Sequence, residues 1–154
     1  MKSLELKIPP LLLVLLFGAA MWLARKYIPL GFDLSREIRL GLFILFSMLA
    51  FAVALAGLLS FRRQKTTVNP INPETASSLV TGGIYQYTRN PMYLGFAVFL
   101  IGWGLWLANI VVLLLVPCFA FYMTRFQIIP EEKALEGLFG GDFTDYKQSV
   151  RRWF

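Results

Sequence analysis

Two long runs of the sequence contain no charged residue, and this restricts the chain to few folds. One extends from Leu40 to Phe61 and the other from Pro91 to Thr124. A helix rises about 1.5 Å per residue, so about 20 residues cross a hydrocarbon core of roughly 30 Å. The first run therefore predicts one membrane-spanning helix at 40–61. The second is too long for a single crossing and predicts two helices.

The turn inside the second run is expected at Asn109, because asparagine favours tight turns. A helical hairpin with arms at 91–107 and 110–126 follows. Another span is predicted at 8–26, where an apolar segment ends at Arg25 and Lys26. A basic start and an apolar segment also occur in cleaved signal peptides, but the length of this segment and its basic stop favour a retained span.

These segments predict an all-α integral membrane bundle with about four transmembrane helices, in a single domain over residues 1–154. With 57% hydrophobic and 16% charged residues, the chain is too apolar for a soluble domain of this size. Its net charge is +6, but the basic residues flank the apolar runs instead of forming a stripe. We therefore expect membrane lipids, and no nucleic acid, as partners.

The sequence has no histidine and a single cysteine, Cys118. Without histidine, the chain lacks the usual general base and the commonest metal ligand. A single cysteine cannot form an intrachain disulfide. We expect no metal site. Cys118 lies inside an apolar run and is expected to be a small buried hydrophobe.

A polar, turn-rich segment changes into an apolar run at Arg89-Asn90-Pro91. Gly82-Gly83 permits a bend before it, Pro91 suits a first helical turn, and the Asn90 side chain is expected to cap the helix. The free first-turn amides, the helix dipole and Arg89 can together hold a carboxylate or phosphate. An ordinary helix start with a snorkelling arginine is the simpler alternative. The preceding segment 66–78 is expected to be irregular.

The tail after Pro130 predicts two short helices. Glu131 and Glu132 would fall in the first turn of the first of these helices, and Gly140-Gly141 would end that helix. The helix dipole stabilises acids in a first turn, so their presence there does not require a bound ligand. The next helix would lie at headgroup level, as an anchor or a lid. Its apolar face would carry Phe143, Tyr146, Val150 and Trp153.

The basic residues also predict the orientation in the membrane. With four crossings, eleven lysines and arginines lie on the side of both termini and four on the other side. Positively charged loops favour the cytoplasm, so both termini are expected to be cytoplasmic, most simply in the cytoplasmic membrane. The same side would carry the helix start at Pro91 and the Glu131-Glu132 pair.

Several motifs follow one another in the second half of the chain, at about 77–154. They are Leu79-Val80-x-x-Gly83-x-Tyr85, then Arg89-Asn90-Pro91-x-Tyr93-x-Gly95, then Glu131-Glu132, Phe139-Gly140 and Tyr146. This order resembles the integral membrane methyltransferases of the isoprenylcysteine carboxyl methyltransferase and phospholipid methyltransferase family. One such motif alone is weak, but several in one order are fairly specific.

The resemblance implies an enzyme that transfers a methyl group from S-adenosylmethionine to a lipophilic acceptor. Arg89 and the helix start would receive the carboxylate of the cofactor, and Glu131 or Glu132 its ammonium group or the acceptor. Tyrosines would enclose the adenosine part. The implied cofactor positions are Leu79, Val80, Gly83, Tyr85, Arg89, Asn90, Pro91, Met92, Tyr93, Glu131 and Glu132.

Two positions depart from the isoprenylcysteine enzymes. Asn90 replaces a histidine, and Gln127 replaces an arginine that would bind the acceptor carboxylate four residues before Glu131. Arg125 is a candidate substitute for orienting the acceptor beside the catalytic candidate Glu131, although helical spacing turns it about 200° away. The acceptor therefore stays open among carboxyl, thiol and amine.

Two other functions are compatible with a small membrane bundle. A transporter usually needs an ionisable group inside a span, and neither 40–61 nor the hairpin contains one. A non-catalytic membrane subunit that keeps the outline of the family is the other alternative.

Overall fold

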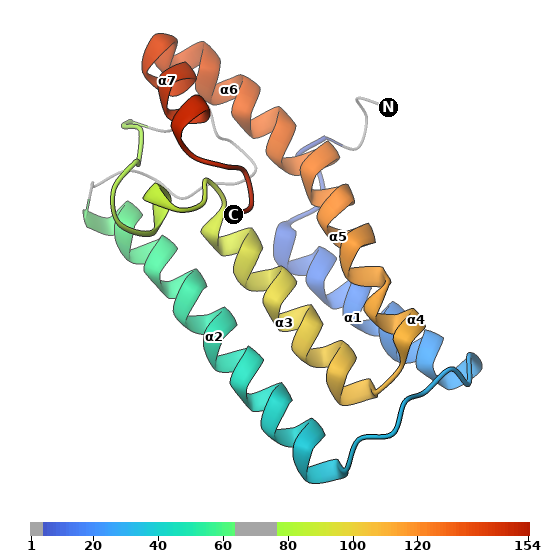
Figure 1. The fold of residues 1–154 in the computed structure, drawn as a ribbon. Helices are drawn as coiled ribbons and strands as arrows, with labels where there is room; N and C mark the ends of the chain where they lie inside the picture. Colours follow the sequence, from blue (N-terminus) through green and yellow to red (C-terminus); the bar gives the residue numbers. More distant parts are fainter. Residues whose placement is uncertain (1–4, 64–76) are drawn as a thin grey trace.

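The computed structural model describes residues 5–63 and 77–154, which form a bundle of helices (Figure 1). Within this part of the chain no β-strand is present, so the predicted all-α class is confirmed. The long helices are α1 (Pro10–Tyr27), α2 (Arg36–Arg63) and α3 (Pro91–Leu107). The remaining elements are η3 (Gly83–Gln86), α4 (Ile110–Leu113), α5 (Leu115–Met123), η4 (Thr124–Ile128), α6 (Ile129–Phe139) and α7 (Gly141–Ser149).

Three of the described helices are long and apolar enough to cross a membrane. They are α1, α2 and the continuous helix Ile110–Phe139 that α4, α5, η4 and α6 build together, while α3 is a shorter apolar helix of 17 residues. Helix α2 buries only Ala50 and Gly57 against the rest of the bundle. Its many exposed apolar side chains would be unfavourable in water and suit lipid. The protein is therefore an integral membrane helical bundle.

Helices α2 and α3 approach so closely that only small residues fit between them. A Cβ atom added at Gly95 would lie 2.8 Å from the carbonyl oxygen of Ala50, and one at Gly102 would lie 2.6 Å from Cβ of Phe46. Such contacts hold membrane helices together by van der Waals packing. This pair of helices supports the start of α3, where the candidate site lies.

The helical hairpin turns at Asn109, as the sequence predicts. Ala108 adopts a left-handed conformation, and the Asn109 side-chain oxygen accepts hydrogen bonds from the amides of Val111 and Val112 at 3.0 and 3.2 Å. The side-chain amide donates to the carbonyl of Ile28 at 2.8 Å. Asn109 therefore caps one helix and fixes the loop after α1 beside it.

The second arm of the hairpin does not end at Phe126. It continues through Pro130 to Phe139, because η4 is a turn of π-helix in which the amide of Ile129 donates to the carbonyl of Thr124. A proline inside a regular α-helix lacks one donor and clashes with a carbonyl four residues earlier. A wider π turn moves that carbonyl away and lets the helix pass the proline.

The tail differs from its predicted form after α7. Gly140, with φ of +52°, ends α6 as expected, but α7 stops at Ser149 and Val150 is extended. Val150 and Trp153 therefore do not continue the helical face. The last residues turn back to the start of α3, where the amide of Arg89 donates to the carbonyl of Arg151 at 3.0 Å. Figure 1 shows this end of the chain beside α3.

Three smaller expectations can be compared with the structure. Cys118 is exposed on α5 instead of buried, because the outer face of a membrane helix contacts lipid. Helix α2 spans Arg36–Arg63 and is thus longer at both ends than the span predicted at 40–61. The irregular segment expected at 66–78 lies almost entirely outside the described residues.

Candidate active site

The loop before α3 is packed between the end of α2 and helix α7. Gly83 has φ of +66°, and a Cβ atom there would lie 2.8 Å from the Ser60 hydroxyl oxygen. Only glycine adopts this conformation without strain. The buried Tyr85 ring packs edge to face on Phe61, and its carbonyl accepts a hydrogen bond from the Tyr146 hydroxyl at 2.7 Å. Burial raises the pKa of Tyr85 and of Tyr146, so both phenols stay neutral.

The guanidinium group of Arg89 is held by the protein itself. It donates to the carbonyls of Lys147 and Val150 at 2.6 and 2.9 Å and to Oε1 of Glu132 at 2.8 Å. Its side chain is only 9% exposed. Arg89 thus joins the start of α3 to α6 and to the residues around the end of α7. Its role as a receptor for the cofactor carboxylate stays a prediction.

Glu132 binds a second arginine, which sequence reasoning missed. Arg152 donates from Nε to Oε1 at 3.0 Å and from Nη2 to Oε2 at 2.7 Å. This hydrogen bonding raises the pKa of Arg152. A carboxylate between two guanidinium groups compensates charges that would be costly to bury alone. Arg152 lies outside the apolar face predicted for the tail helix, and nothing else in the sequence indicated a role for it in the site.

Asn90 does not cap α3 as expected. Its side-chain amide donates instead to the carbonyl of Arg152 at 2.9 Å. The returning tail offers this acceptor, and it competes with the local cap. No side chain of the described residues caps the first turn of α3, so the amides of Met92 and Tyr93 have no such partner.

Glu131 is held by neutral donors. Its Oε1 atom accepts hydrogen bonds from the hydroxyl of Tyr93 and from the side-chain amide of Gln127, the latter at 2.8 Å. Tyr93 and Gln127 are 6% and 2% exposed. None of the ion pairs between described residues involves Glu131. The site therefore contains a carboxylate that can still bind a cation or accept a proton.

Some predicted residues face elsewhere. Arg125 forms an ion pair with Glu5 at 3.1 Å and lies over the ring of Phe126. The side chains of Pro91 and Met92 reach Gly57 of α2. Leu79 and Val80 belong to an apolar cluster with Tyr85, Phe143 and Tyr146. The predicted roles of these residues in binding cofactor or acceptor stay predictions.

This arrangement defines a class of protein: an integral membrane helical bundle with a polar site at one end, where α3 begins and α6 lies against it. The profile of phospholipid methyltransferases matches residues 38–142, which include Arg89, Tyr93 and both glutamates of the site. The chain belongs to the phospholipid methyltransferase family.

Relatives among characterised proteins point in the same direction. The chain is 36% identical over 72 residues to protein-S-isoprenylcysteine O-methyltransferase of Schizosaccharomyces pombe, covering 47% of this chain and 30% of that enzyme. It is 36% identical over 98 residues to protein-S-isoprenylcysteine O-methyltransferase A of Arabidopsis thaliana, covering 62% and 48%. The match therefore spans less than half the length of either enzyme.

A third relative is an uncharacterised protein of Haemophilus influenzae. It is 45% identical over 62 residues, which cover 40% of this chain and 98% of that protein. No solved structure matches the chain significantly.

Proposed function

We propose that the protein transfers a methyl group from S-adenosylmethionine to a lipophilic acceptor at the end of the bundle where α3 begins. The observation that carries this proposal is the contact of the α3 start with both acids of α6, through Tyr93 with Glu131 and through Arg89 with Glu132. Membership of the phospholipid methyltransferase family supports it. Bound S-adenosylmethionine supplies an electrophilic methyl group on a sulfonium centre.

The residues fit the charges of this cofactor. Glu131 has no ion-pair partner among the described residues and is complementary to an ammonium or sulfonium group. The uncapped amides of Met92 and Tyr93 are complementary to a carboxylate, since the start of a helix carries a partial positive charge. Because Arg89 is engaged with Glu132, we assign the carboxylate to these amides and a structural role to Arg89.

The same site favours an acceptor without negative charge, such as an amine. Gln127 is neutral where the resemblance implies an arginine, and Arg125 pairs with Glu5. A carboxylate acceptor would therefore lack the arginine partner that the resemblance implies next to Glu131. With an amine acceptor, Glu131 would accept the proton that the nitrogen must lose when it is methylated.

We place this end of the bundle, and both termini, at the cytoplasmic face. The distribution of basic residues supports this orientation. It gives the site access to the water-soluble cofactor, while the apolar helices give access to an acceptor dissolved in lipid.

The test supplies methyl-labelled S-adenosylmethionine to membranes with and without the protein and identifies the molecule that gains label. Label in a lipid amine supports the full proposal, and label in a thiol or carboxyl group overturns the assignment of the acceptor. Cofactor binding without transfer, together with a copurifying partner, would indicate a non-catalytic subunit. Proton-coupled flux in liposomes without methyl transfer would indicate a transporter.

A further inference from the structure

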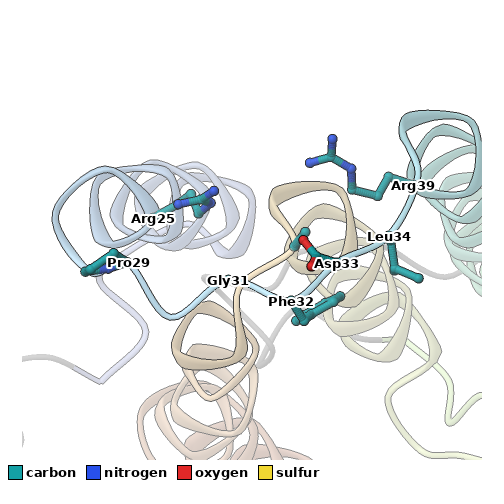
Figure 2. A pocket seen from close by; sticks show the side chains of 8 residues that line it. Arg25, Pro29, Gly31, Phe32, Asp33, Leu34 and Arg39 are labelled. Atoms are coloured by element: carbon teal, nitrogen blue, oxygen red, sulfur yellow. The ribbon is translucent and has the colours of Figure 1, made fainter.

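A second polar site lies at the opposite end of the bundle. A cavity of about 440 Å³ opens between the end of α1, the start of α2 and the end of α3. Its charged lining consists of Arg25, Asp33 and Arg39 (Figure 2). In Figure 1 this end of the helices is far from the tail and from α6. The candidate active site contributes none of its residues to this lining.

The two arginines of this cavity are positioned but not neutralised. Arg25 donates from Nε to the carbonyl of Leu107 at 3.0 Å, and Arg39 lies 5.8 Å from the centre of the Trp106 ring. Neither arginine forms an ion pair with a described residue, and Asp33 forms none either. The Nε atom of Arg39 is buried without a hydrogen-bond partner among these residues. Buried donors without partners are rare and call for an explanation.

In Figure 2 the side chains of Arg25 and Arg39 come from α1 and α2, on either side of the loop that carries Asp33. Two guanidinium groups from different helices suit the oxygens of a phosphate, because each presents several donors in a planar fork. Asp33 reduces the positive charge of the cavity to a net +1. The net charge of the lining therefore attracts an anion.

We propose that this cavity binds the phosphodiester headgroup of a membrane lipid. The site lies where apolar helices end, next to exposed apolar residues of α1 and α2 such as Leu23 and Leu40, which suit acyl chains. A lipid phosphodiester carries one negative charge and matches the net charge of the lining. Free phosphate offers similar oxygens but lacks the acyl chains, so lipid and free ion can be distinguished by experiment.

The test titrates dioleoylphosphatidylglycerol into the full-length protein in detergent and measures bound lipid by native mass spectrometry and the shift in melting temperature. Arg39→Gln is expected to weaken binding about tenfold, the loss typical of one charge-assisted hydrogen bond. Arg36→Gln is the matched control, because Arg36 is an exposed cation one turn earlier on α2 and does not line the cavity. Asp33→Asn is expected to tighten binding, since it removes a negative charge beside the phosphate.

Equal weakening by Arg36→Gln and Arg39→Gln would overturn the proposal, because it would indicate general attraction between the protein surface and anionic lipid. Weaker binding after Asp33→Asn would overturn it as well. Inorganic phosphate at the same concentration is expected to give no shift in melting temperature. A shift as large as that of the lipid would show that the cavity takes the free ion and would overturn the assignment to lipid.

Discussion

The hydroxyl of Tyr93, near the start of α3, donates a hydrogen bond to Glu131 of α6 across 38 positions of sequence. This bond brings together two helix segments that the sequence only suggested were related. Gln127 donates to the same carboxylate oxygen. The other oxygen of Glu131 receives no hydrogen bond from a described residue, which makes this carboxylate the central group of the proposed site.

Glu131→Gln is expected to weaken binding of S-adenosylmethionine by tenfold to a hundredfold, roughly the effect of losing one hydrogen bond to a charged group. The shape of the side chain is kept, so the melting temperature should change little. Isothermal titration of the purified protein measures the affinity. Glu136→Gln is the control, because Glu136 lies on the same helix and pairs with the partly exposed Lys147. Equal affinities in all three proteins would contradict the proposed role of Glu131.

Tyr93→Phe should lower the rate of methyl transfer about tenfold while keeping the fold. The substitution removes one of the two donors that orient Glu131 and leaves the aromatic packing in place. The measurement is transfer of labelled methyl groups at saturating cofactor. Tyr122→Phe is the control, since the Tyr122 ring packs on Phe126 and its hydroxyl has no described partner. A similar loss in both variants would mean that the hydroxyl of Tyr93 has no specific role.

Glu132→Gln is expected to destabilise the protein more than Arg152→Met. The first change leaves Arg89 buried without its carboxylate, which typically costs about 3 kcal/mol or more. The second leaves Glu132 paired with Arg89, and the side chain of Arg152 is one-third exposed, so about 1 kcal/mol is expected. Thermal or denaturant unfolding in detergent compares the two. The reverse order would show that the tail, and not Arg89, is the main partner of Glu132.

Gly95→Ala should destabilise the bundle, whereas Gly41→Ala should be neutral or slightly stabilising. The new methyl group at position 95 would meet the backbone of α2, which cannot move away cheaply, whereas nothing lies within 4 Å of a Cβ atom at position 41. Alanine also has a higher helix propensity than glycine, and this favours the substitution at both positions. Melting temperatures of the two variants test the contact between α2 and α3. If both variants melted at the same temperature, the close approach of these helices would be refuted.

Local features of the fold were predictable from the sequence, and features that depend on distant contacts were not. Asn109 interrupts the second uncharged run and caps the next helix with its own side chain, so the turn follows from local chemistry. Asn90 stands at an equally suitable helix start, but the tail provides a competing acceptor at Arg152, 62 positions away. The motif order singled out the two acids and the start of α3 as candidates, yet it contained no information on the returning tail.

The passage of the last long helix through Pro130 was hidden for a similar reason. A proline after an apolar run usually indicates a new helix. Whether the chain breaks or widens there depends on packing on both sides of the turn, and Gln127 and Ile128 in η4 are both buried. That burial favours a continuous helix.

The π turn also sets the direction in which the proposed site faces. Each residue of a regular helix advances the side chains by about 100°, so the surplus residue in Thr124–Ile128 rotates everything after it by that angle. Removing one residue from this turn would leave Tyr93 where it is and swing Glu131 a quarter of the way or more around the helix axis. This single additional residue thus determines whether Tyr93 and Glu131 of the proposed site lie next to each other. The type of its side chain matters less than the extra backbone that it adds.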